Sequence, residues 1–79
     1  MKIKILGGGC AKCERLEKLT RETAAEVGAK ATFIKVKDLD AIMAYDVMST
    51  PALVIDEEVK SFGRIPRKEE IAKWIQAAL

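Results

Sequence analysis

The sequence predicts an α/β fold in which a four-stranded mixed sheet carries helices on both faces. Short β-branched runs alternate with segments whose apolar residues recur at every third or fourth position, the period of a helix. Gly7–Gly9 separates the first such run from the first helical segment. The expected order of elements is β-α-β-α-β-β-α, in a single domain that spans residues 1–79.

The first strand and the first helix are the clearest elements. Lys2–Leu6 is short and β-branched, and glycines follow it, as is typical of strands. The helix begins at Ala11 and ends before Gly28, a residue type favoured just after a helix C-terminus. Its apolar face comprises Cys13, Leu16, Leu19, Thr20, Thr23, Ala24 and Val27. Its charged outer face comprises Glu14, Arg15, Glu17, Lys18, Arg21 and Glu22.

A second strand and a short helix follow. Residues 31–36 form the strand, which we expect to be largely buried because the adjacent Phe33 and Ile34 face opposite sides. A strand–helix–strand start implies a right-handed crossover and a parallel strand pair. Asp38 can cap a helix over residues 39–44. The residues expected to point inward from it are Leu39, Ile42 and Met43.

The last third of the chain predicts a hairpin and a final helix. Residues 52–55 and 59–62 are the third and fourth strands, and the tight turn 56–58 between them implies antiparallel pairing. Pro66 suits the first turn of the final helix. The apolar stripe of that helix comprises Ile71, Trp74, Ile75, Ala78 and Leu79.

Composition excludes several function classes. The chain has 79 residues, 49% of them apolar, and a net charge of +2. The charge is too balanced, and the lysines too scattered, for a nucleic-acid surface. No apolar run approaches the ~20 residues of a membrane span, and the N-terminal run is too short and too interrupted for a signal peptide. We therefore expect a cytoplasmic monomer that binds neither nucleic acid nor membrane.

The two cysteines, Cys10 and Cys13, lie where the first helix begins. At this spacing their sulfurs are close enough to join, yet closing so short a loop gives only about 2 kcal/mol of stability. The pair therefore suits a bond that is made and broken. Backbone N–H groups of the first turn and the charge of Lys12 favour the thiolate of Cys10, whereas Cys13 lies one turn inside the helix. We predict that Cys10 attacks, Cys13 resolves, and Lys12 tunes the pKa of Cys10.

Less specific interpretations of these residues remain open. The cysteines can be two small apolar core residues, and Lys12 can be a solvated surface lysine. A metal site is a further alternative, although two thiolates fill half of a tetrahedral zinc site and the chain has no histidine. We expect no metal and no cofactor.

Cys10–Cys13, together with Ser49–Pro51 directly before a strand, resembles the thioredoxin superfamily. The chain is most similar to the small redox-active disulfide proteins, thioredoxin- or glutaredoxin-like, of archaea and bacteria. The resemblance implies a thioredoxin-like fold and a cis Thr50–Pro51 peptide bond packed opposite the cysteines. It also implies that Thr50 and Pro51 bind an extended segment of the substrate.

The chain departs from this family at three positions. Thioredoxins carry a buried acid six residues before the first cysteine, where this chain has Lys4. Glutaredoxins have a glutathione-binding lysine at the position of Gly7. Asp46 stands where relatives often have glycine, and aspartate tolerates a left-handed conformation better than most residues.

The function expected from these observations is reduction of protein disulfides by thiol–disulfide exchange. The partners would be disulfide-containing target proteins and a thioredoxin-reductase-like electron donor. Two alternatives are a soft-metal binding module for copper or zinc, and a redox-sensing adaptor that changes a partner surface without turnover. The copper-chaperone alternative lacks the usual methionine at Gly8, and its chains end on a strand rather than a helix.

Overall fold

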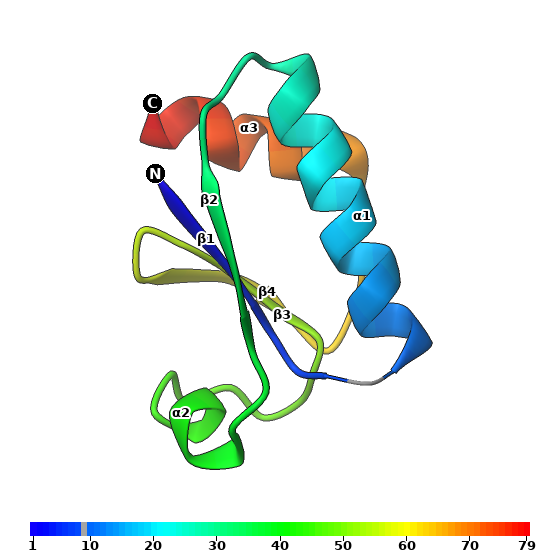
Figure 1. The fold of residues 1–79 in the computed structure, drawn as a ribbon, viewed down its shortest axis with the longest axis vertical. Helices are drawn as coiled ribbons and strands as arrows, with labels where there is room; N and C mark the ends of the chain where they lie inside the picture. Colours follow the sequence, from blue (N-terminus) through cyan, green and yellow to red (C-terminus); the bar gives the residue numbers. More distant parts are fainter. Residues whose placement is uncertain (9) are drawn as a thin grey trace.

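The order of elements agrees with the prediction. A computed structural model describes residues 1–8 and 10–79. Its elements are β1 (Lys2–Leu6), α1 (Ala11–Glu26), β2 (Thr32–Val36), α2 (Leu39–Met43), β3 (Ala52–Ile55), β4 (Glu58–Phe62) and α3 (Lys68–Ala78) (Figure 1).

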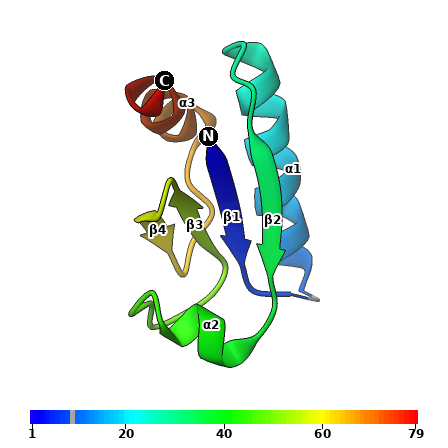
Figure 2. The same ribbon diagram turned by 60° about the vertical axis from the view of Figure 1, so that its left-hand side comes forward.

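One mixed sheet contains the four strands in the order β2-β1-β3-β4 (Figure 2). β1 is parallel to β2 and antiparallel to β3, and β3 is antiparallel to β4. Leu6 pairs with Ala52, so the end of β1 meets the start of β3. The loop after Leu6 and the segment before Ala52 therefore lie at the same end of the sheet, although they are far apart in sequence.

Helices pack on both faces of the sheet, as expected. α1 and α3 cover one face, where the buried core residues are Ile3, Ile5, Leu16, Ala24, Leu53, Ile55, Ile71 and Ile75. α2 lies on the other face, where the buried residues are Leu6, Ile42, Ala52 and Val54. Successive residues of a strand point to opposite faces, which explains why adjacent residues of β1 and β3 contribute to different clusters.

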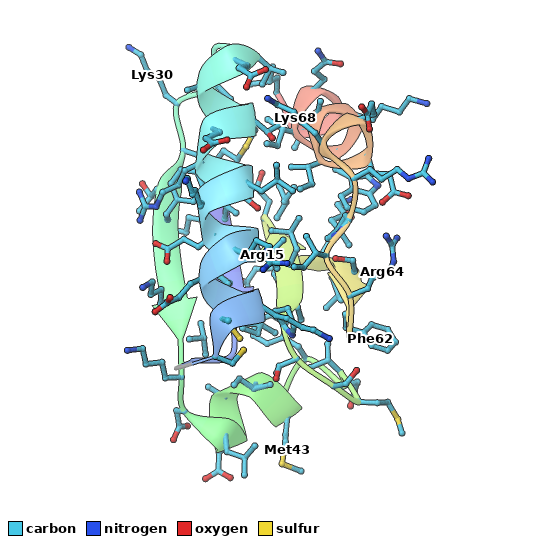
Figure 3. All side chains as sticks on the ribbon, turned by 90° about the vertical axis from the view of Figure 1, so that its right-hand side faces the viewer. Arg15, Lys30, Met43, Phe62, Arg64 and Lys68 are labelled. Carbon is cyan, nitrogen blue, oxygen red and sulfur yellow. The ribbon has the colours of Figure 1, made fainter. Side chains whose placement is uncertain are left out.

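The orientation of α2 differs from the prediction. The Asp38 carboxylate caps the helix by accepting a hydrogen bond from the Ala41 N–H at 3.0 Å, and Ile42 is buried. Leu39 and Met43, however, are 67% and 60% exposed, and Met43 extends away from the protein (Figure 3). A helix of five residues turns only slightly more than once, so it presents little more than one side chain to the sheet.

Two expectations about burial are also wrong. Phe33 and Ile34 are half-buried rather than largely buried, because β2 is an edge strand with a neighbour on one side only. Leu79 is 71% exposed, because it lies past the last residue of α3 rather than on its packed stripe.

The hairpin and α3 begin slightly differently from the prediction. Asp56 and Glu57 both have positive φ, the backbone conformation of a two-residue hairpin turn, so β4 begins one residue early, at Glu58. α3 begins at Lys68, two residues after Pro66. Its N-terminus is closed by the Glu70 carboxylate, which accepts a hydrogen bond from the backbone N–H of Arg67 at 3.2 Å.

Candidate functional site

Cys10 and Cys13 lie together at the N-terminus of α1. Cys10 is the N-cap residue, with extended backbone (φ −113°, ψ 153°), and its Sγ accepts a hydrogen bond from the Cys13 N–H at 3.2 Å. A sulfur thus takes the capping position usually held by a serine or aspartate oxygen. Cys10 is exposed, whereas Cys13 is 5% exposed, and both are free thiols. The site therefore presents one sulfur to solvent and keeps the other beneath it.

The pKa values of the two thiols shift in opposite directions. Hydrogen bonds from the Cys13 side chain and backbone N–H lower the pKa of Cys10, with smaller contributions from the backbone N–H and the charge of Lys12. Burial is the main cause that raises the pKa of Cys13 to about 11, and the neighbouring Cys10 adds to it. Cys10 is therefore the thiol that ionises first.

This shift predicts a loss of stability of the reduced protein at alkaline pH. Between about pH 9 and pH 11 an unfolded cysteine loses its proton while folded Cys13 keeps it. The unfolded state then binds fewer protons, so the free energy of unfolding falls as the pH rises through this window. Urea unfolding of the reduced and the disulfide-oxidised protein checks this, since the oxidised form has no thiol to titrate. Parallel pH profiles of the two forms would contradict the prediction.

Gly7 separates the buried thiol from the segment before β3. Its φ is +114°, and a Cβ added to it would lie 3.0 Å from Cys13 Sγ and 3.0 Å from Thr50 Cβ. Thr50 and Cys13 therefore approach each other across the backbone of a residue that has no side chain. The Thr50–Pro51 peptide bond is cis, as the resemblance implied. Pro51 is buried, and its carbonyl accepts a hydrogen bond from the Gly63 N–H at 2.9 Å.

Replacing Gly7 by alanine should therefore both strain the backbone and displace Cys13. The backbone conformation alone costs about 1–3 kcal/mol for a residue with a side chain. We expect a lower midpoint in urea unfolding and slower closure of the Cys10–Cys13 disulfide under mild oxidation. Gly28→Ala is the matched control, since Gly28 also has positive φ (+71°) but no atom lies within 4 Å of the added Cβ. Equal rates of disulfide closure in the two variants would contradict the assigned role.

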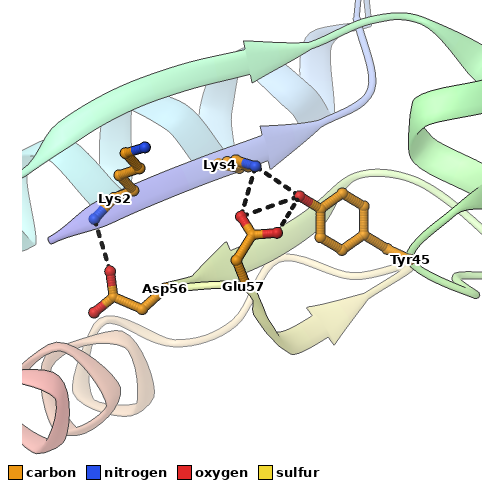
Figure 4. Close-up of polar contacts among 5 residues, drawn as sticks. All are labelled: Lys2, Lys4, Tyr45, Asp56 and Glu57. Carbon is orange, nitrogen blue, oxygen red and sulfur yellow. Dashed lines mark hydrogen bonds and ion pairs between the residues drawn. The ribbon is translucent and has the colours of Figure 1, made fainter.

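Lys4, which stands where thioredoxins have an acid, points away from α1. Its neighbours Ile3 and Ile5 belong to the core beneath α1, so the alternation of β1 sends Lys4 to the opposite face. There its Nζ lies 2.6 Å from a Glu57 carboxylate oxygen and donates a hydrogen bond to the Tyr45 hydroxyl at 2.7 Å (Figure 4). The hydrogen bond to Glu57 is the main cause that raises the pKa of Lys4. Lys4 is thus a cation held in a polar cluster with Glu57 and Tyr45.

The nearby bend at Asp46 has φ +58°, the left-handed conformation expected of it.

A cleft of about 80 Å³ opens beside Cys13, between the start of α1 and the end of β2. Its charged lining residues are Glu14, Glu17, Lys35 and Lys37. The sequence assigned Glu17 to the outer face of α1, but this side chain is only 15% exposed. The signal that points to it is its spacing, because residues four apart on a helix are neighbours and Glu17 follows Cys13 by four.

Within residues 1–8 and 10–79, no group of three or more His, Cys, Asp or Glu side chains is placed to hold a metal ion. In the same residues, no helix has the length and apolar character needed to cross a membrane.

Comparison with known proteins agrees with the fold. The family model described as "Thioredoxin domain" matches residues 1–76. A protein named "Thioredoxin" from Methanothermobacter thermautotrophicus is 47% identical over 73 residues, which cover 92% of this chain and 95% of that protein. Another protein named "Thioredoxin", from Methanocaldococcus jannaschii, is 32% identical over 77 residues, covering 98% of this chain and 88% of that one. With its four-stranded mixed sheet and its cysteine pair at the start of α1, the chain belongs to the thioredoxin family.

Proposed function

We propose that this protein reduces disulfide bonds of other proteins, with Cys10 as the attacking and Cys13 as the resolving cysteine. Family membership supports thiol–disulfide oxidoreductase activity in general. The observation that supports the division of roles is the asymmetry of the pair. Cys10 is exposed and has a lowered pKa, whereas Cys13 is buried and has a raised one.

The proposed reaction has two exchange steps. The Cys10 thiolate attacks one sulfur of the target disulfide, forms a Cys10–target disulfide, and expels the other target sulfur as a thiolate that takes up a proton. Cys13 then loses its proton and attacks Cys10 Sγ, which forms the Cys10–Cys13 disulfide and expels the second target thiolate. Two electrons pass from the protein to the target. A reductase of the thioredoxin-reductase type would return two electrons and two protons.

Thr50 and Pro51 are proposed to bind the target next to the cysteines. Thr50 is exposed and close to Cys13 across Gly7, and only Pro51 separates it from β3. An extended target segment can add its backbone hydrogen bonds to such a position in the manner of an extra strand. Two exposed side chains offer apolar contacts. Met48, which precedes β3, is 89% exposed, and Phe62, the last residue of β4, is 48% exposed. A cytoplasmic location is part of the proposal, since that compartment keeps thiols reduced.

Transfer of electrons to insulin tests this function. Reduced protein incubated anaerobically with excess insulin should lose both thiols and gain one Cys10–Cys13 disulfide, while insulin gains two thiols for each protein molecule. Thiol titration and mass spectrometry of the separated proteins measure both sides of the reaction. Retention of both thiols, with one-to-one binding of copper(I) to the reduced protein, would instead favour the soft-metal module.

A further inference from the structure

The second exchange step leaves one proton without an obvious acceptor. Burial is the main cause that raises the pKa of Cys13, and burial persists while Cys10 is joined to a target. At neutral pH almost all of Cys13 is therefore protonated, yet only its thiolate attacks. Lys4, at the position where the resemblance implied an acid, is a cation on the opposite face of the sheet. Some other group must take the proton from Cys13.

The cleft beside Cys13 leads to a carboxylate. Glu17 lies one helical turn after Cys13 on the same face of α1, so their Cβ atoms are about 5–6 Å apart. Both side chains line the cleft. Its volume of about 80 Å³ exceeds the roughly 10–15 Å³ that one water needs, and its polar lining offers that water partners. A water can therefore join the thiol to the carboxylate.

Two cations hold the Glu17 carboxylate in place. Lys35 Nζ lies 2.9 Å from Oε1, and Arg21 Nε donates to Oε2 at 3.0 Å. Each carboxylate oxygen has two lone pairs, so each retains one for a water. The hydrogen bond from Lys35 is the main cause that lowers the pKa of Glu17, and Arg21 adds to it. Glu17 is thus ionised at neutral pH and holds a proton only briefly. The other charged groups that line the cleft are Glu14 and Lys37.

We propose that Glu17 accepts, through water in the cleft, the proton that Cys13 loses when it attacks the Cys10–target disulfide. The S–H bond of Cys13 breaks, its electron pair forms the Cys10–Cys13 bond, and the departing target sulfur leaves with the electron pair of the old disulfide. The proton passes from water to Glu17 and then to solvent at the mouth of the cleft. Glu17 acts through this water and does not touch the reacting sulfurs, so it is a positioning residue in this step. The proposal rests on the dithiol function proposed above.

Stopped-flow reaction of the reduced protein with 5,5′-dithiobis(2-nitrobenzoate) separates the two steps. The first thionitrobenzoate released reports attack by Cys10, and the second reports attack by Cys13. In Glu17→Gln we expect the first phase unchanged and the second slowed about 10²-fold at neutral pH. A 10²-fold effect is at the low end of the rate enhancement that a general base contributes, as expected of a carboxylate whose pKa is lowered. Glu17→Asp should restore most of the rate, since a water still bridges the gap.

The pH profile separates proton transfer from a merely structural role. Between about pH 6 and pH 9 the second phase of the wild type should change little, because Glu17 stays ionised. In Glu17→Gln it should rise about tenfold per pH unit, following the small fraction of Cys13 thiolate. Glu14→Gln, which changes another carboxylate of the cleft lining and leaves Glu17 and its ion pairs intact, should retain the fast second phase.

Several results would overturn the proposal. A second-phase rate of Glu17→Gln equal to that of the wild type would exclude Glu17 as the acceptor. Second phases that are equally slow in Glu14→Gln and Glu17→Gln would exclude it as well. A uniform slowing with an unchanged pH profile would assign it a structural role instead. Failure of the proposed function is distinguishable, because the wild type would then keep both thiols in the anaerobic experiment with insulin, whatever its second-phase rate with 5,5′-dithiobis(2-nitrobenzoate).

Discussion

Cys10→Ser is expected to abolish reduction of insulin, with a residual rate at least about 10³-fold below that of the wild type. A serine hydroxyl cannot form a disulfide with the target. The remaining thiol cannot substitute, because Cys13 is 5% exposed and has a pKa of about 11. At neutral pH only about 10⁻⁴ of it is thiolate. Turbidity of reduced insulin in the presence of dithiothreitol measures the rate, corrected for the reaction without protein.

Cys13→Ser is the matched variant, with the same atomic change one helical turn away. It keeps the exposed thiol, so the first exchange step should proceed and the Cys10–target disulfide should accumulate. Non-reducing gels and mass spectrometry detect the adduct. Urea unfolding of both variants separates loss of chemistry from loss of fold. Insulin reduction by Cys10→Ser at the wild-type rate, or adducts that form on Cys13 rather than Cys10, would show that the roles are assigned wrongly.

The second large effect is unequal alkylation of the two thiols in the wild type. At neutral pH iodoacetamide should modify Cys10 at least about 30-fold faster than Cys13. An ordinary thiol with a pKa near 8.5 is about 3% ionised at this pH, several hundred times more than Cys13. The higher intrinsic nucleophilicity of a more basic thiolate offsets roughly tenfold of this difference. Burial of Cys13 widens the gap further.

Quenched samples digested and analysed by mass spectrometry give the two rates separately. The denatured protein is the control, since unfolding removes the hydrogen bonds and the burial that distinguish the thiols, and the two rates should then converge. Equal alkylation of both cysteines in the folded protein would contradict the asymmetry on which the proposed mechanism depends.

The order of elements could be predicted from the sequence because its signals are local. The β-branched run of β1, the helical spacing of α1 and the capping aspartate of α2 each depend on a few neighbouring residues. The errors concern burial, which depends on distant parts of the chain. Phe33 and Ile34 are half-buried because β2 is an edge strand, and strand order cannot be read from two adjacent apolar residues. The exposure of Leu39 and Met43 follows from how α2 lies on the sheet.

In the candidate site, too, the features that depend on neighbouring residues could be predicted, and those that depend on distant parts of the chain could not. The asymmetry of Cys10 and Cys13 was predictable from their positions in the first turn of α1, where one caps the helix and the other faces the core. The strongest cause of the lowered pKa of Cys10 was not predictable. This cause is a hydrogen bond with the thiol of Cys13 rather than the charge of Lys12. The place of Gly7 between Cys13 and Thr50 depends on the pairing of β1 with β3. The ion pair of Glu17 depends on β2 lying beside α1.

The two outer strands also bear on how the protein avoids self-association. β2 and β4 each leave one row of backbone groups without a neighbouring strand in the sheet, and such rows can template pairing with another copy. Lys35 lies on β2 and Lys60 on β4. A charged side chain on a free edge disfavours edge-to-edge aggregation, because the charges of two approaching copies must be desolvated. A protein proposed to accept extended target strands at Thr50 can thereby confine strand addition to the place where its reactive sulfur lies.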